Sequence, residues 1–195
     1  MTNFLTSFFV TCSPVILGGV ANMFFVKTKW FKKNAKRLDR EKKWVDGKAI
    51  FGKNKTDLGF VGMIIFTMIF QIILGICIDK NNLNSYSLFY EIYNNSIKVN
   101  TILGLVLGMC YMVFELPNSF IKRRINIEEG KTKKTRLGKI FFVVDQIDSL
   151  IGIGILIYAI TNASGLMCIG FVLFGGCIHI AINTSLYLTK VRKNI

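Results

Sequence analysis

The stretch LGFVGMIIFTMIFQIILGICI, residues 58–78, carries no charged side chain, and Gln71 is its only amide side chain. A helix that crosses the hydrocarbon core of a bilayer needs roughly 20 mostly apolar residues. This stretch meets that requirement without help from its neighbours. It therefore predicts a membrane-spanning helix.

Four more stretches are apolar and long enough, or nearly so, to cross a bilayer. Together they predict an all-α integral membrane protein, a single polytopic domain of residues 1–195, with five transmembrane helices at about 4–26, 58–78, 99–115, 139–160 and 166–188. The first has no basic segment before it and no clear cleavage site, so we interpret it as a retained span. Gly104 and Gly108 form a G-x-x-x-G pattern in the shortest span, which is typical of a close helix contact.

The composition agrees with a membrane protein. The mean hydropathy is +0.47 and 52% of the residues are apolar, although the net charge is +14. These values conflict in a soluble globule but agree when charges lie in loops and apolar residues in spans. Because topology explains the charge, we expect no nucleic acid partner. The five cysteines fall in apolar runs without a C-x-x-C, which argues against a disulfide framework or a zinc site.

The basic residues gather in two connecting segments, which we expect to be cytoplasmic loops at 27–57 and 116–138. The first holds 12 Lys and Arg residues, segment 116–139 holds eight and the tail from Lys190 holds three, against only Lys80 and Lys98 on the other side. The positive-inside rule then places the N-terminus outside and the C-terminus in the cytoplasm. We expect a multi-pass protein of the cell membrane with its active site on the cytoplasmic side.

The first basic loop contains GKAIFGKNKT, residues 47–56, which is one residue short of a P-loop. A P-loop needs a strand before it and a Ser or Thr hydroxyl after its Lys, whereas here Asn54 takes the hydroxyl position. The P-loop interpretation is therefore rejected. The two glycines permit a tight turn, and Lys48 and Lys55 are expected at the cytoplasmic mouth of a span, as one wall of a phosphate site.

Two acids lie within the predicted span 139–160. Asp145 and Asp148 are three residues apart and share one helix face. Two unpaired carboxylates this close repel each other, and either a divalent cation such as Mg²⁺ or a Lys or Arg from a neighbouring loop relieves the repulsion. The spacing leaves both alternatives open.

Other polar side chains are predicted at the same depth, in the cytoplasmic half of the bundle. The set comprises Asn22, Glu115, Asp145, Gln146, Asp148, His179 and Asn183. Ionisable groups within spans usually mark a function, although a lone His such as His179 is more often a packing residue than a ligand.

The second basic loop begins LPNSFIKRR, residues 116–124. Ser119, Lys122 and Arg123 gather on one side if the helix continues past Pro117, which is tolerated as an early helix residue or a kink. Lys and Arg beside a carboxylate-held metal form a trap for phosphate. The alternative is a solvated basic loop that attracts anionic headgroups, which we favour for Lys131, Lys133, Lys134 and Arg136.

The ordered combination of these motifs resembles the CDP-archaeol synthase family, five-span relatives of CDP-diacylglycerol synthase. The resemblance covers nearly the whole chain and rests on Ala21-Asn22, GKAIFGKNKTDLG (47–59), Ser119 to Arg124, Asp145 to Asp148, and a His and an Asn near the last span. It implies a Mg²⁺-dependent cytidylyltransferase that transfers CMP from CTP to a membrane lipid phosphate. The products would be pyrophosphate and a CDP-lipid for phospholipid biosynthesis.

The resemblance also implies roles for individual residues. Catalysis is expected at Lys122, Arg123, Asp145 and Asp148; metal binding at Asp145, Asp148 and Glu115; and substrate binding at Asn22, Lys48, Asn54, Lys55, Thr56, Ser119, Arg124, His179 and Asn183. A lipid phosphate oxygen would attack the α-phosphorus of CTP. Mg²⁺, Lys and Arg would neutralise the approaching anions and the leaving pyrophosphate.

Three positions depart from the family pattern. Lys53 stands where an Asp is common, Leu58 stands where an Arg is common, and Glu115 or a neighbour stands in place of a G-D pair. The lipid substrate stays open between archaeol-type, diacylglycerol-type and other isoprenoid phosphates, and an inactive relative is conceivable. The main alternative is a non-enzymatic membrane protein or a small transporter with an intramembrane acidic site. A homodimer is compatible with the sequence.

Overall fold

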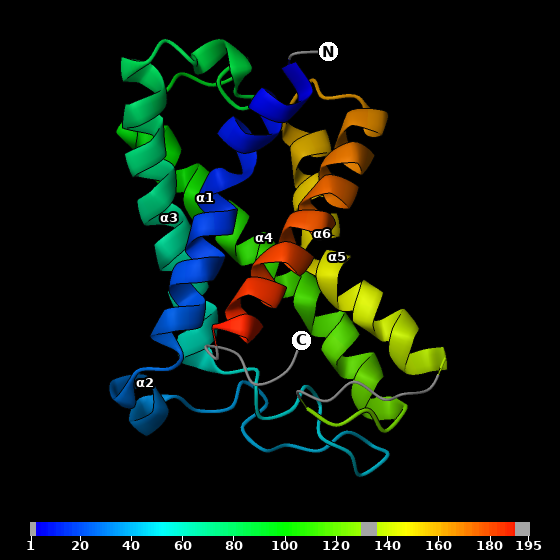
Figure 1. The fold of residues 1–195 in the computed structure, drawn as a ribbon. Coiled ribbons are helices and arrows are strands. Elements are labelled where there is room, and N and C mark those ends of the chain that lie inside the picture. Colours follow the sequence, from blue (N-terminus) through cyan, green and yellow to red (C-terminus); the bar gives the residue numbers. More distant parts are fainter. Residues whose placement is uncertain (1–2, 130–135, 190–195) are drawn as a thin grey trace.

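The computed structural model describes residues 3–129 and 136–189, and within these ranges strand pairing is limited to two isolated bridges. The helices, shown in Figure 1, are α1 (Asn3–Phe25), α2 (Lys29–Asn34), α3 (Asp57–Lys80), η1 (Asn84–Tyr86), α4 (Ile97–Arg124), α5 (Arg136–Ile160) and α6 (Gly165–Leu188). Five of them, α1 and α3 to α6, are long and apolar enough to cross a membrane. The prediction of an all-α protein with five membrane spans is confirmed. Lys131, Lys133, Lys134 and the tail from Lys190 lie outside the described residues.

The main difference from the predicted boundaries is at the end of α4. This helix continues through Pro117 to Arg124, so the expected loop 116–138 was wrong in its first nine residues, which are helical. The apolar run ends near Glu115, but the helix does not, because Asn118 and Lys122 in its last turns form hydrogen bonds with α5. The other four spans begin and end within one helical turn of the prediction.

Hydroxyl side chains fix where three of the membrane helices begin. Thr56, Ser96 and Ser164 each accept a hydrogen bond from the backbone N–H three residues later, at the start of α3, α4 and α6 respectively. Such N-caps satisfy one of the four N–H groups that have no partner within the helix. Each helix therefore begins where the chain leaves a polar segment.

The close contact predicted for the G-x-x-x-G pattern is confirmed. Gly104 and Gly108 of α4 lie directly against the backbone of α3, and a Cβ added at Gly108 would come within 2.6 Å of the Ile64 Cα. The same construction at Gly104 meets the Met68 Cα even more closely. Small residues at such a contact let two helices approach and gain van der Waals contact where lipid gives no hydrophobic drive.

The five spans form a curved row in which each helix packs on the next, in the order α1, α3, α4, α5 and α6. The first and last helices of the row, α1 and α6, meet near the start of the chain. There Phe4 and Phe8 of α1 pack edge-to-face against Phe171 and Phe174 of α6, with ring centroids 4.9–6.2 Å apart. Edge-to-face aromatic pairs of this kind add favourable energy beyond the area they bury. The helices therefore surround an internal space that the aromatic cluster closes at one end.

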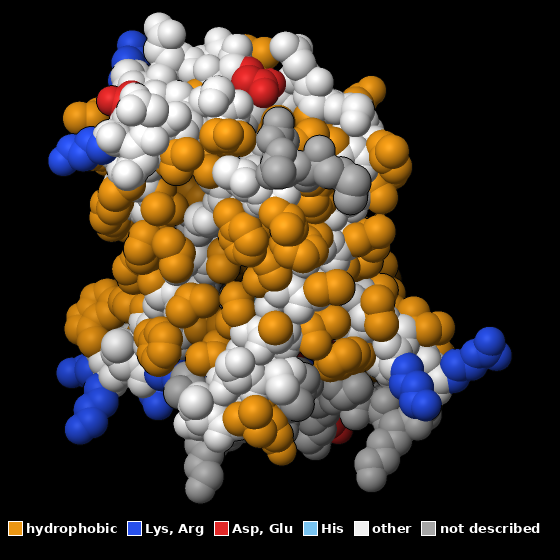
Figure 2. All heavy atoms as spheres, turned by 45° about the horizontal axis from the view of Figure 1, so that its top comes forward, with side chains coloured by type: hydrophobic (Ala, Val, Ile, Leu, Met, Phe, Trp, Pro, Cys, Tyr) orange, Lys and Arg blue, Asp and Glu red, His pale blue; other side chains and the backbone are white. Residues whose placement is uncertain are grey.

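The two ends of the bundle differ in character. One, which we call the loop end, carries residues 26–56 and 125–129 and lies at the bottom of Figure 1. The other, the turn end, carries residues 81–96 and 161–164. Between them, hydrophobic side chains cover the visible face in Figure 2, while Lys and Arg side chains project at its lower edge and at its upper left. Large apolar side chains are exposed on all five long helices, as expected for a surface that faces lipid.

Candidate functional site

A cavity of about 650 Å³ extends from the loop end into the bundle. Its deeper part is lined by apolar side chains such as Phe8, Val15, Met63 and Ile153, and its outer part by polar and charged ones. Twelve of the residues predicted for the site line this single cavity: Asn22, Asn54, Lys55, Thr56, Glu115, Ser119, Lys122, Arg123, Asp145, Asp148, His179 and Asn183. They come from four of the five long helices, α1, α4, α5 and α6, and from the first basic loop.

The two aspartates of α5 meet the last turns of α4 at the centre of the cavity. Asn118 Nδ2 donates to Asp145 Oδ1 and to Asp148 Oδ2, at 2.6 Å each. Lys122 Nζ, one turn further along α4, lies 2.6 Å from Asp145 Oδ2. Asp148 Oδ1 accepts from the backbone and the hydroxyl of Ser149. The pairing of an acid with a basic side chain, one of the two alternatives raised by the spacing, is thus observed for Asp145.

The donor set also fits a hard cation. Asp145 and Asp148 converge on one point, where the Asn118 nitrogen lies between their oxygens, and Asn118 Oδ1 is buried without a hydrogen-bond partner among the described residues. Carboxylate and amide oxygens are the ligands that Mg²⁺ takes in proteins. Within residues 3–129 and 136–189, no three His, Cys, Asp or Glu side chains form a ready metal-binding group. Any such site would therefore need the amide, or oxygens from a substrate or water.

The first basic loop reaches the same cavity through Lys55. Its Nζ lies 2.6 Å from Glu115 Oε2 on α4, and both side chains line the cavity. Thr56, the next residue, uses its hydroxyl to cap α3. The loop is thus joined to two helices at the position where its polar side chains face the cavity.

Three further polar side chains lie in the cavity wall. Asn22 Nδ2 of α1 donates to the Gly59 carbonyl of α3 at 3.0 Å, and Asn183 Nδ2 of α6 donates to Gln146 Oε1 of α5 at 2.9 Å. His179 Nδ1 lies 3.2 Å from the Gln146 carbonyl oxygen. The amide oxygens of Asn22 and Asn183 are buried without a hydrogen-bond partner in the described part of the chain. Unmet buried acceptors are costly, so they mark positions at which a ligand or a water supplies the missing donor.

Two predicted site residues, Lys48 and Arg124, are not among the residues that line the cavity. Lys48 Nζ donates to the Arg124 carbonyl at 2.7 Å, and the Arg124 guanidinium pairs with Asp46 at 3.0 Å, donates to the Ala49 carbonyl and lies over the ring of Phe120. These contacts tie the first basic loop to the end of α4. Both residues therefore shape the entrance from outside it.

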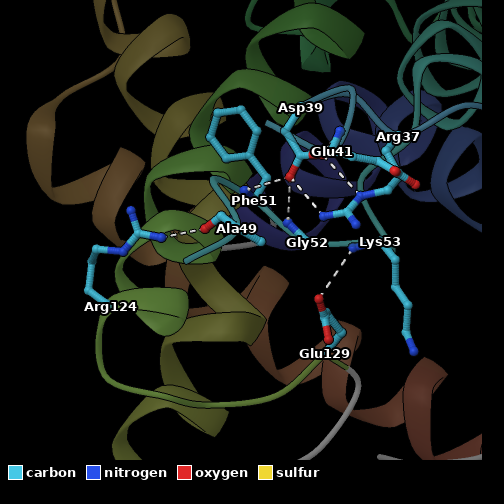
Figure 3. Close-up of polar contacts among 9 residues, drawn as sticks. All are labelled: Arg37, Asp39, Glu41, Ala49, Phe51, Gly52, Lys53, Arg124 and Glu129. Atoms are coloured by element: carbon cyan, nitrogen blue, oxygen red, sulfur yellow. Dashed lines mark hydrogen bonds and ion pairs between the residues drawn. The ribbon is translucent and has the colours of Figure 1, made fainter. Parts of the chain in front are cut away.

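The backbone amides of GKAIFGKNKT are already held by carboxylates of the chain itself. Figure 3 shows Asp39 Oδ2 accepting from the backbone N–H groups of Phe51 and Gly52, at 3.2 Å each, and paired with Arg37. Burial opposes ionisation of Asp39, but the hydrogen bonds from Gly52, Arg37, Phe51 and Glu41 outweigh it and lower its pKa. Gly52 adopts a φ of +103°, which favours glycine. The segment is thus a turn fixed by Asp39, which agrees with the rejection of a P-loop.

Sequence reasoning did not assign four residues that shape this site: Asn118, Gln146, Asp39 and Glu129. Asn118 had a signal, because it stands one turn before Lys122 within the LPNSFIKRR motif. Gln146 lies within the Asp145 to Asp148 motif, but the motif assigns no role to it. Asp39 and Glu129 lie in irregular segments, where no periodicity indicates which acid contacts which amide.

Comparison with known proteins agrees with this arrangement. Residues 20–194 match the family model described as CarS-like, CDP-archaeol synthase. The chain belongs to this family. It is 31% identical over 126 residues to the CDP-archaeol synthase of Pyrococcus abyssi, covering 65% of this chain and 59% of that protein. It is also 29% identical over 155 residues to the CDP-archaeol synthase of Methanocaldococcus jannaschii, covering 80% of each chain. The match to the Pyrococcus protein thus spans less than two thirds of that relative's length.

A solved structure has the same fold. It is that of an intramembrane enzyme for archaeal membrane lipids biosynthesis, and it superposes with a TM-score of 0.64 at 15% sequence identity over 90% of this chain and 92% of the other. The family resemblance predicted from the ordered motifs is confirmed. Together with the five apolar helices, these similarities identify a multi-pass membrane protein.

Proposed function

We propose that the protein is a cytidylyltransferase that transfers CMP from CTP to a membrane lipid phosphate and releases pyrophosphate. The observation that carries the proposal is the acid centre, in which Asn118 joins Asp145 and Asp148 beside Lys122, in the wall of a cavity that opens at the basic end of the bundle. The similarity to CDP-archaeol synthases supports the reaction. The finer choice between an archaeol-type and a diacylglycerol-type lipid is left to the assay below.

The cavity suits two anionic substrates, one of which has apolar chains. Lys55, Lys122 and Arg123 line its outer part, where they would neutralise the triphosphate and the lipid phosphate as these approach each other. The deeper apolar wall would accommodate hydrocarbon next to the headgroup. A lipid phosphate oxygen would form a bond to the α-phosphorus as the bond to the β-phosphate oxygen breaks. The attacking oxygen is already anionic, so little general-base catalysis is required.

Asp145 and Asp148 would hold a Mg²⁺ ion, with the Asn118 amide oxygen as a third ligand in place of the predicted Glu115. Glu115 pairs with Lys55 of the loop, whereas Asp145 and Asp148 share the Asn118 amide. A bound Mg²⁺ would supply charge stabilisation for the phosphate oxygens and the leaving pyrophosphate. Lys122, one turn beyond Asn118 on α4, would neutralise phosphate charge beside these ligands.

The orientation follows from the charge distribution. The cavity opens beside the two basic segments, and the positive-inside rule would place these segments, and the end of α6, in the cytoplasm. CTP would then enter from the cytosol and the lipid phosphate from the headgroup region of the same leaflet. The homodimer considered from the sequence stays a prediction.

The test is turnover of radiolabelled CTP by membranes that contain the protein, with a panel of lipid phosphates read out by mass spectrometry. Asp148→Asn removes one charge from a buried carboxylate with little change in shape. We expect it to lower kcat by roughly 10²-fold or more, the size of effect seen when one preorganised electrostatic group is removed.

The matched control is Asp79→Asn, which removes an exposed carboxylate at the opposite end of α3, where Asp79 accepts from Asn84. It should leave turnover unchanged. Wild-type turnover in the Asp148→Asn protein would contradict the role of this acid. Transport of an ion without CTP consumption by the wild-type protein would favour the small-transporter alternative.

A further inference from the structure

Glu129 lies in the wall of the cavity and contacts groups that ordinarily bind anions. Its Oε1 accepts from the Lys53 backbone N–H at 3.4 Å, and its Oε2 lies 3.6 Å from Arg123 NH1. Its side chain also covers Gly52, where an added Cβ would come within 2.8 Å of the Glu129 Cγ and Oε1. Figure 3 shows the Glu129 carboxylate directed at this turn of the first basic loop. An anion of the chain itself therefore occupies an anion-binding position of the cavity.

These contacts are longer than those of Asp39, which binds the same turn of the first basic loop. The Asp39 side chain is fully buried and its contacts with Arg37 and three backbone amides measure 3.0–3.2 Å. The Glu129 side chain is 24% exposed, and its contacts with the Lys53 N–H and Arg123 NH1, at 3.4 and 3.6 Å, are longer than any of these. Asp39 is thus bound firmly within the turn, whereas Glu129 is bound to it more weakly.

Arg123 has binding capacity that Glu129 does not use. The guanidinium is 9% exposed, and its Nε is buried without a hydrogen-bond partner in residues 3–129 and 136–189. A guanidinium binds a phosphate best through two parallel N–H groups. A phosphate group carries more charge and more acceptor oxygens than a carboxylate, so it would bind the Lys53 N–H and the parallel N–H groups of the NH1–NH2 edge of Arg123 more strongly than Glu129 does. The unmet Nε, on the neighbouring edge, leaves Arg123 a further donor.

We propose that the Lys53 N–H and the Arg123 guanidinium form a phosphate subsite, and that Glu129 occupies it until a substrate phosphate displaces it. This proposal rests on the proposed function and adds to it the position of one phosphate and an internal competitor. Repulsion between two anions requires Glu129 to leave as the phosphate enters. Glu129 lies beyond the end of α4, so its side chain can turn away without disturbing a helix. The phosphate is that of CTP or of the lipid, which share this chemistry.

The test is Glu129→Gln, which keeps the shape and an acceptor for Lys53 but removes the charge. A competitor that occupies the subsite lowers apparent affinity in proportion to its occupancy, and for a partly exposed ion pair we expect KM to fall about two- to fivefold with kcat unchanged. A fall in the KM for CTP alone assigns the subsite to the nucleotide, and a fall in that for the lipid phosphate alone assigns it to the lipid. The matched control is Glu128→Gln, which removes the same charge from an exposed neighbour that does not line the cavity.

Pyrophosphate binding to the purified protein, measured by calorimetry, separates this proposal from the proposed function because it requires no turnover. Tighter pyrophosphate binding by Glu129→Gln than by wild type supports the subsite even if no lipid phosphate is converted. Equal or weaker binding in a variant that melts at the wild-type temperature would overturn it. If Glu129→Gln is unstable, Glu129→Asp serves as the second variant. Its shorter side chain withdraws the charge from Lys53 and Arg123, so it should also tighten binding, by a smaller factor.

Discussion

The bundle buries polar side chains at two levels, and the two groups differ in how completely they are paired. Toward the turn end, Gln71, Tyr90, Asn95 and Asn100 form a neutral network. Tyr90 OH and Gln71 Nε2 donate to Asn100 Oδ1, Asn100 Nδ2 donates to Asn95 Oδ1, and Asn95 Nδ2 donates to the Gly75 carbonyl. We call these four residues the turn-end network.

Toward the loop end, the cavity combines charges with unmet hydrogen-bonding groups. Asp145, Asp148 and Lys122 meet there, and the buried amide oxygens of Asn22, Asn118 and Asn183 have no partner in the described part of the chain. Buried polar groups are normally paired, since an unmet one costs about 1–3 kcal/mol. The turn-end network leaves Gln71 Oε1 unmet but uses all the polar groups of Asn100, as a structural element should. At the loop end, the unmet amide oxygens line the cavity, where a substrate would supply the missing hydrogen-bond donors.

The largest effect that this comparison predicts is on catalysis at the loop end. Lys122→Met removes a cation from the cavity and leaves Asp145 without its ion-pair partner. If Lys122 stabilises charge in the transition state, kcat should fall roughly 10²- to 10³-fold, or about 2.7–4 kcal/mol in the barrier. The measurement is the initial rate of CTP turnover at saturating substrates.

Lys122→Arg is the matched variant, because it keeps the charge within reach of Asp145. It should retain more activity than Lys122→Met. If the rate of Lys122→Met stayed within a factor of about three of wild type, the change would be well below the effect of one electrostatic group. That result would contradict a catalytic role for Lys122 at the loop end.

The next effect concerns stability at the turn end. Asn100→Leu has a similar volume but leaves Tyr90 OH without its acceptor and Asn95 Oδ1 without its donor, in a region where Asn100 is 2% exposed. We expect the free energy of unfolding to fall by about 1–2 kcal/mol. The measurement is the melting temperature in detergent, together with kcat per folded molecule, which should not change. A stable protein with lowered kcat would show that the two polar groups are coupled.

The five spans could be predicted from the sequence because each apolar run is a local property. The depth of the polar residues followed from the spans, and together with the motifs it indicated most of the polar side chains that line the cavity, without knowledge of any contact. The role of Asn118 could not. It depends on how α4 packs against α5, since the two acids it joins are 27 and 30 residues away along the chain.

The loops show the limit of sequence patterns most clearly. Lys48 and Arg124 are basic residues in the right motifs, yet they contact each other and Asp46 outside the cavity wall. Glu129 belongs to no motif and lies in that wall. In a helix, spacing indicates which side chains share a face, but an irregular segment has no such periodicity. Which acid reaches the amides of residues 51–53 is therefore settled only by the folded backbone.

The smallest predicted effect is a response to acidic pH. It separates the two ends because, among the described residues, a buried carboxylate holds a turn at the loop end and not at the turn end. The pKa of Asp39 is lowered from its ordinary value of 3.8, so the ionised form favours the folded turn. This contribution is complete above the unfolded value and is lost as the pH falls through the lowered value in the folded protein. Protection of the Phe51 and Gly52 amides from hydrogen exchange, corrected for the intrinsic rate, should therefore fall below that pH, while amides near the turn-end network keep theirs.

Asp39→Asn should abolish this acid dependence, because an amide keeps the acceptor oxygen and does not titrate. At neutral pH it also loses the charge that Arg37 binds, so protection in the turn should fall by about 1 kcal/mol, equivalent to roughly fivefold. Glu41→Gln, in which the side chain is exposed and the backbone N–H still donates to Asp39, should retain the wild-type pH dependence. If the Asp39→Asn turn lost protection in acid as the wild type does, the loop end would owe its pH response to other carboxylates. Glu129, whose pKa is lowered against the effect of burial by its own N–H, the Lys53 N–H and the Arg123 charge, would then be the next residue to change.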